Sequence, residues 1–141
     1  MSRTKKYRSL QAFSILLALT VQAKAAEDGD WTVVTMSREG AFGVYTHASM
    51  AVAIATAVRY CKSRSFDSDC GAEFRVVRRG WILAELCGDQ RVLAAGQSLD
   101  EAEAQLLFRI DLKRAYIPNL PSCKRIFAID PNGRVHCRPN S

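Results

Sequence analysis

The chain has 141 residues, with 20 Lys and Arg against 14 Asp and Glu, which gives a formal charge of +6. Five of the basic residues and none of the acidic ones lie in residues 1–25, so residues 26–141 carry a formal charge of only +1. This near neutrality argues against a nucleic-acid-binding protein. Setting aside 25 of the 141 residues leaves 116, enough for one domain with a modest core and too few for two.

Residues 1–25 have the pattern of a secretory signal peptide. Four basic residues within the first eight positions precede an apolar run near residues 12–21, and Ala23 and Ala25 then form a small-x-small cleavage site. The apolar run of about ten residues is well short of the roughly 20 that a membrane-spanning helix needs. We therefore expect cleavage after Ala25, export to the periplasm or the medium, and no membrane span in the mature chain.

Export also suggests a role for the five cysteines, because thiols usually pair in an oxidising compartment. Cys70 follows Cys61 by nine residues, whereas Cys87 and Cys123 lie much further apart. We expect the disulfides Cys61–Cys70 and Cys87–Cys123, which leaves Cys137 without an assigned partner.

The first half of the domain reads as a hairpin, a helix and a strand. Turn chemistry and β-propensity predict the hairpin over residues 31–46, and a third strand is expected over residues 72–78. Between them, residues 49–61 read as a helix, and almost every residue from 50 to 58 is apolar, so we expect it to be covered on more than one side. Four residues at fourfold spacing form its inner stripe: Ser49, Ala53, Ala57 and Cys61.

The second half repeats this order, with a hairpin over residues 81–95, a helix that opens at Ser98 and a strand over residues 125–130. The distance from the first tryptophan of each half to the serine that opens its helix is 18 residues in one half and 17 in the other. This agreement indicates an internal duplication. A short edge strand is expected over residues 134–137. The inward stripe of the second helix is Leu99, Ala102, Leu106 and Ile110.

These patterns predict a single α+β domain over residues 26–141 that is stabilised by disulfides. Two tandem ββαβ repeats, about 31–78 and about 81–130, would form an antiparallel sheet with both helices packed on one face, followed by a loose C-terminal tail. Closure of the two repeats into a barrel-like sheet is the alternative architecture.

The same residues resemble a family of small exported bacterial proteins that carry the domain of unknown function 4189. The resemblance covers roughly residues 31–130 and rests on a glycine and aromatic return strand, a small-residue helix that ends in cysteine, an Asp-Cys pair before a strand, and a second copy of this order. It implies export and a disulfide-bonded α+β domain, and it brings no established activity or catalytic residues. The residues that carry it are Gly40, Phe42, Gly43 and Tyr45, then Ser49, Ala53, Ala57 and Cys61, then Asp69 and Cys70.

Three arginines are the candidate binding residues. Arg75, Arg78 and Arg79 lie on the third strand and in the turn that ends it, so Arg75 and Arg79 share a face if the strand pleat continues, with Arg78 beside them. A basic edge that discourages strand pairing would explain them structurally. The functional alternative is a surface for an envelope or extracellular protein or another anionic surface, and nucleic acid is not expected as a partner.

Cys87, in a predicted turn, is the candidate nucleophile that can be named, with an unidentified serine as the alternative, and either would need His47 as a base brought to it by the fold. His136 and Cys137 could hold a soft metal only with a third ligand that the sequence does not supply. We therefore predict no catalytic residue, metal or cofactor. The expected function is a non-catalytic binding or interaction module of the cell envelope, and the alternative is a small secreted hydrolase or thiol-dependent enzyme.

Overall fold

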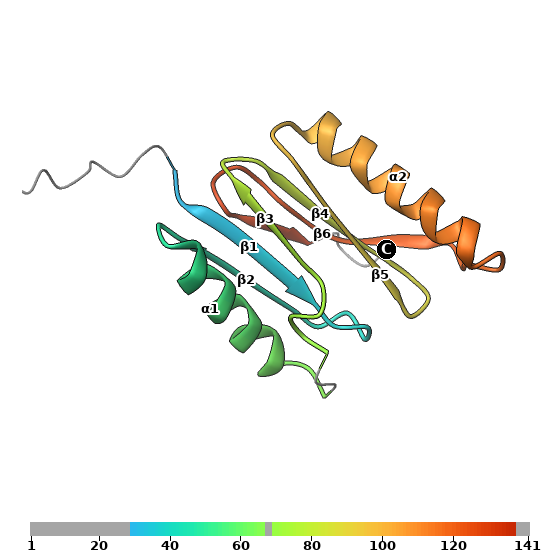
Figure 1. Cartoon of the computed structure of the whole chain (residues 1–141), viewed down its shortest axis with the longest axis horizontal. Helices are drawn as coiled ribbons and strands as arrows, with labels where there is room; N and C mark the ends of the chain where they lie inside the picture. The colour runs from blue at the N-terminus through green and yellow to red at the C-terminus, as the bar shows by residue number, and fades with distance from the viewer. Residues whose placement is uncertain (1–28, 67–68, 138–141) are drawn as a thin grey trace, which may run out of the picture.

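The computed structural model describes residues 29–66 and 69–137, which form seven strands and two helices (Figure 1). In chain order the elements are β1 (Trp31–Met36), β2 (Phe42–His47), α1 (Met50–Lys62), β3 (Phe74–Arg78), β4 (Trp81–Cys87), β5 (Gln90–Gly96), α2 (Leu99–Tyr116), β6 (Cys123–Ile129) and β7 (Val135–Cys137). The helices begin where the sequence predicts, because the side chain of Ser49 caps α1 and that of Ser98 caps α2.

The seven strands form two antiparallel sheets, with the orders β2-β1-β3 and β5-β4-β6-β7. In each repeat the first strand lies in the middle, with its hairpin partner on one side and the strand that follows the helix on the other. Trp31 and Trp81 open the two middle strands, and each packs beside the apolar cluster under its own helix. The α+β class and the two tandem ββαβ repeats are therefore confirmed, and β7 is the expected edge strand.

The two sheets pack face to face around the main core. One large aromatic residue comes from each sheet, with the ring centroids of Phe42 and Phe127 4.3 Å apart. The buried apolar side chains of this core come from both repeats, so the duplication buries its two halves against each other. They are Val34, Met36 and Val77 from the first sheet and Ile82, Ala84, Leu93, Phe127 and Ile129 from the second.

Each helix covers the outer face of its own sheet. Ala53 and Ala57 of α1 pack on Val33. Of the predicted inward stripe of α2, Ala102, Leu106 and Ile110 pack on the outer side of β4 and β5, whereas Leu99 in the first turn is 40% exposed and does not belong to it. Figure 1 shows the two helices on opposite outer sides with the strands between them. The expectation of one sheet with both helices on one face is corrected in this respect: the repeats stack as helix, sheet, sheet and helix.

Helix α1 lies directly against β2. A Cβ atom added to Gly43 would lie 1.9 Å from the carbonyl oxygen of Ala57, so only glycine allows this approach. The opposite side of the helix is open, because Met50 and Val52 are 43% and 42% exposed. The prediction that α1 is covered on more than one side is therefore wrong: its alanines allow close packing on one sheet, Ile54 packs at the edge of that contact, and Met50 and Val52 face outward.

Both predicted disulfides are present. Cys61–Cys70 joins the end of α1 to the loop before β3, and Cys87–Cys123 joins paired positions on the neighbouring strands β4 and β6. These crosslinks fit an oxidising compartment. The predicted signal peptide, residues 1–25, and the predicted tail beyond residue 137 lie outside the described residues. Neither helix in the described part of the chain is long and apolar enough to cross a membrane.

Candidate functional site

The structure separates Arg75 from the other two candidate arginines. Val34, its partner on β1, and Val77, two residues along β3, both point into the core between the sheets. The Arg75 side chain therefore reaches the second sheet, where its Nε donates to the carbonyl oxygen of Leu93 at 3.1 Å. Burial and then the nearby charge of Arg109 lower the pKa of Arg75, and Glu73 offsets part of this effect. Arg75 thus connects the two repeats and does not belong to an exposed edge.

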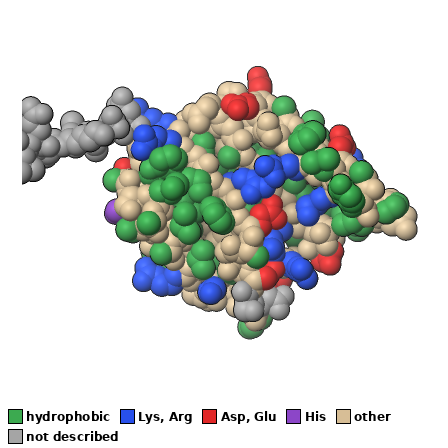
Figure 2. Space-filling model, in the orientation of Figure 1, with side chains coloured by type: hydrophobic (Ala, Val, Ile, Leu, Met, Phe, Trp, Pro, Cys, Tyr) green, Lys and Arg blue, Asp and Glu red, His purple; other side chains and the backbone are tan. Residues whose placement is uncertain are grey.

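Arg78 and Arg79 lie together where β3 turns into β4. The guanidinium carbon of Arg78 lies 4.3 Å from the ring centroid of Trp31, a cation–π contact that fixes this side chain on the α1 side of the sheet. Arg79 is exposed and has a φ of 51°, the left-handed conformation of a tight turn. Within the described residues, no hydrogen bond or ion pair holds the Arg79 guanidinium. Figure 2 shows basic side chains at the end of the molecule where β1 begins.

A polar pocket of about 330 Å³ lies beside Arg79. Thr32 and Thr46 from the first hairpin line it, with their hydroxyl oxygens 2.9 Å apart, and Asn132 contributes an amide from the turn before β7. Asp30 is the acidic residue of the lining. The pocket therefore combines one guanidinium, one amide and a pair of hydroxyls. Because one hydroxyl of the pair donates to the other, the pair has one O–H left for an anionic group.

Cys87 is not available as a nucleophile. It is fully buried and bonded to Cys123, so the hypothesis of a thiol enzyme that uses Cys87 with His47 as base is contradicted. The imidazole of His47 instead accepts a hydrogen bond from the backbone N–H of Ser49 at 2.9 Å, just before α1. His47 therefore supports the start of that helix.

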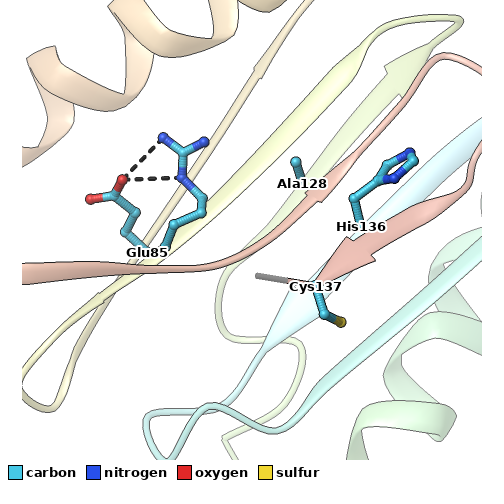
Figure 3. A pocket seen from close by; sticks show the side chains of 5 residues that line it. Glu85, Ala128, His136 and Cys137 are labelled. Carbon is cyan, nitrogen blue, oxygen red and sulfur yellow. Dashed lines mark hydrogen bonds and ion pairs between the residues drawn. The ribbon is translucent and has the colours of Figure 1, made fainter. Parts of the chain in front are cut away.

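A second pocket, of about 420 Å³, lies over β6 and β7 and contains the free Cys137 (Figure 3). His136 points to the other side of β7 from Cys137 in this view, so the imidazole is not placed to deprotonate the neighbouring thiol. His136 instead hydrogen-bonds Asp130 at 2.9 Å, and this contact lowers the pKa of Asp130. Within residues 29–66 and 69–137, no group of three His, Cys, Asp or Glu side chains could hold a metal ion.

Arg125, at the inner wall of this pocket, is already neutralised by acidic side chains. Its guanidinium donates to Glu85 at 3.1 Å and to Glu103 of α2 at 2.8 and 3.0 Å, and these partners raise the pKa of Arg125 against the opposing effect of burial. An anionic ligand would have to displace one of these carboxylates. The polar pocket beside Arg79 is therefore the better candidate binding site.

A separate ion-pair cluster joins the repeats and predicts a dependence on pH. Arg91 of β5 pairs with Asp69 in the loop before β3 and lies 3.5 Å from Glu73. Burial would raise the pKa of Asp69, but the hydrogen bond and charge of Arg91, with help from Arg38, hold it below its ordinary value of 3.8. Because the folded pKa is the lower one, this pair stabilises the fold above pH 4 and loses its effect as pH falls through the folded pKa.

We expect Asp69→Asn to be less stable than the parent protein at neutral pH, and the difference to shrink below pH 4. Urea unfolding at a series of pH values measures both effects. Asp89→Asn, at an exposed carboxylate in the β4–β5 turn, is the matched control. A difference between Asp69→Asn and the parent that stays constant down to about pH 2 would show that the charge of Asp69 does not stabilise the fold.

Comparison with known proteins gives no match: no family model, curated protein or solved structure is similar to this chain at a significant level. The resemblance to the exported domain family therefore stays a prediction. The candidate site stands on its geometry alone.

Proposed function

We propose that this protein is an exported, non-catalytic binding module that recognises an anionic group on an envelope or extracellular partner through Arg78 and Arg79. The observation that carries the proposal is the placement of Arg79, exposed beside a polar pocket and held by no other described side chain. Arg78 does not line this pocket: Trp31, opposite it on β1, holds its guanidinium on the α1 side of the sheet, where it can contact the same partner. A guanidinium that is already positioned loses less freedom when it binds a ligand.

The pocket chemistry indicates the kind of group that would bind. A carboxylate or phosphate can accept hydrogen bonds from the Arg79 guanidinium together with one hydroxyl of the Thr32–Thr46 pair, since the other hydroxyl donates within the pair. Asp30 in the same lining repels additional negative charge. A single anionic group on a partner therefore fits this site better than a densely charged polymer.

The proposed export rests on two features that agree with each other. Residues 1–25 have the pattern of a cleavable signal peptide, and the folded domain contains two disulfides. We place the mature chain in the periplasm or the surrounding medium. Mass spectrometry of the N-terminus tests this: a mature chain that starts at Ala26 supports export, and retention of Met1 in the cytosol contradicts it.

We expect the double variant Arg78→Ala/Arg79→Asn to lose most partner capture. Asparagine is chosen at position 79 because it tolerates the left-handed backbone there, so the change removes charge with little strain. Loss of the contact with Trp31 should lower the free energy of unfolding by only about 0.5–1 kcal/mol. Capture is measured by incubating the immobilised, oxidised protein with envelope extract at about 50 and 500 mM salt and quantifying the bound fraction.

Arg59→Ala/Lys62→Ala, which removes two charges from the exposed last turn of α1, is the matched control and should keep full capture. Capture by the parent protein should also fall at the higher salt, because exposed charge pairs are screened. If the double variant at Arg78 and Arg79 folds and captures partners as well as the control does, these two arginines are not the binding surface.

A further inference from the structure

A polar pocket of about 160 Å³, which we call the junction pocket, lies at the opposite end of β1 from Arg79. Both repeats contribute to it, through the turn after β1, the segment before β3, the start of β5 with the turn before it, and the last turn of α2. Figure 2 shows basic and acidic side chains in the band between the regions where Figure 1 places α1 and α2. The residues that line the pocket are Arg38, Glu73, Asp89, Gln90, Arg91 and Lys113.

The charges around the junction pocket do not cancel. Three basic and two acidic side chains line it, which leaves a formal charge of +1. Glu73 is neutralised, because its oxygens lie 3.4 Å from Arg75 and 3.5 Å from Arg91. Adding Arg75 and Asp69, which pair with these lining residues, contributes one charge of each sign and leaves the balance at +1. The pocket therefore favours a negatively charged ligand.

Two basic side chains of the lining keep hydrogen-bond donors that no protein group accepts. Lys113 is half-buried, and within the described residues no hydrogen bond or ion pair holds its ammonium group. Arg91 donates one N–H to Asp69, and its buried Nε makes no hydrogen bond to the part of the chain that the structure describes. Buried donors in folded proteins are nearly always paired, so these two groups point to a bound acceptor.

Arg109 adds positive charge beside the pocket. It lies one turn before Lys113 on the same side of α2, and its Nε is also buried without a hydrogen bond to any described residue. Burial and then the charge of Arg109 lower the pKa of Arg75, so the two guanidinium groups lie close enough to repel each other. An anion in the neighbouring pocket would reduce this repulsion.

We propose that the junction pocket binds a phosphate group, with Lys113, Arg91 and Arg38 as its donors. These side chains come from α2, β5 and the turn after β1, so they reach the pocket from three separate elements. A phosphate group offers three strong acceptor oxygens, whereas a carboxylate offers two. The pocket volume corresponds to roughly five water molecules, which suits a phosphate group and excludes a large ligand. The site shares no residue with the pocket beside Arg79.

NMR titration of the oxidised protein with inorganic phosphate, at neutral pH and constant ionic strength, tests this proposal. We expect saturable shifts of the Arg91 Nε–H and of the Asp89 and Gln90 backbone N–H groups, with a dissociation constant of about 1 mM. Lys113→Gln should weaken this binding about threefold or more, because it removes one charge from the lining. Arg114→Gln is the matched control and should keep the parent affinity, because Arg114 is exposed, pairs with Asp111 and does not line the pocket.

The acidic side of the lining gives the opposite change. Asp89→Asn removes an exposed carboxylate from the pocket and should tighten phosphate binding about threefold. Shifts that rise linearly without saturation, or equal weakening by Lys113→Gln and Arg114→Gln, would overturn the site. Acetate that binds as tightly as inorganic phosphate would overturn its assignment to a phosphate group.

Methyl phosphate distinguishes the two sources of such a group. Tighter binding of methyl phosphate than of inorganic phosphate assigns the junction pocket to a phosphate group carried by a partner. Tighter binding of inorganic phosphate assigns it to the free ion. In both cases the Lys113→Gln variant should leave the response of the Arg79 Nε–H unchanged, because Arg79 belongs to the other pocket.

Discussion

Replacing both Cys87 and Cys123 with alanine should lower the free energy of unfolding by about 4 kcal/mol. This disulfide closes a sequence separation of 36 residues that includes all of β5 and α2, so it restricts the unfolded chain more than the other disulfide does. Cys87 is also fully buried, and its truncation leaves unfilled space in the apolar cluster between α2 and its sheet. Urea unfolding followed by circular dichroism measures the change.

The matched control is Cys61→Ala/Cys70→Ala, which opens a separation of only nine residues. Chain entropy then suggests a loss of about 2.5 kcal/mol. The difference between the two double variants tests the entropic explanation. Equal losses, or a larger loss at Cys61 and Cys70, would mean that local packing outweighs the restriction of the unfolded chain.

Phe127→Ala should lower the free energy of unfolding by about 3–5 kcal/mol, the usual range for a buried phenylalanine. Phe127 is fully buried between the two sheets and packs on Phe42 of the other repeat. Its loss therefore removes part of the contact that holds the two repeats together. Urea unfolding again measures the change: the midpoint concentration of urea should fall, and the dependence of the unfolding free energy on urea concentration should stay the same.

Phe66→Ala is the control for this change, because the Phe66 side chain is fully exposed and its truncation should alter stability by less than about 0.5 kcal/mol. Comparable losses at Phe66 and Phe127 would contradict a core between stacked sheets. A loss at Phe127 below about 1 kcal/mol would do the same.

The repeat pattern and the cysteine pairs could be predicted from the sequence because they depend on spacing along the chain. Equivalent tryptophans precede equivalent helix caps by nearly equal distances along the chain. Each repeat accordingly folds into a sheet with the same strand order, in which the tryptophan-bearing strand lies between its hairpin partner and the strand after the helix. The stacking of the two sheets was missed, although β1 contained a signal for it. Val33 and Val34 are adjacent and both fully buried, which requires cover on both faces of the strand.

The candidate site was only partly predictable. Arg75 and Arg78 are three positions apart on one strand, so their side chains point to opposite faces, and this periodicity argues against a single arginine edge. The pocket beside Arg79 depends on the register of the first hairpin, which pairs Thr32 with Thr46. A shift of one residue would place Tyr45 opposite Thr32, and sequence alone did not determine this register. Asn132 reaches the pocket through contact between the repeats, which no local pattern reports.

The most direct test of the proposed function is a titration of the oxidised protein with acetate and with inorganic phosphate, followed by NMR of the arginine side-chain Nε–H groups. A preformed anion site in the pocket predicts a saturable shift at Arg79, which lines it, and a smaller shift at Arg78 and at the indole N–H of Trp31, which lie on the α1 side of the sheet. Arg59 and Arg114, which are exposed on the two helices, should shift only slightly and without saturation. Equal, unsaturable shifts at all four arginines would contradict a binding site at Arg78 and Arg79.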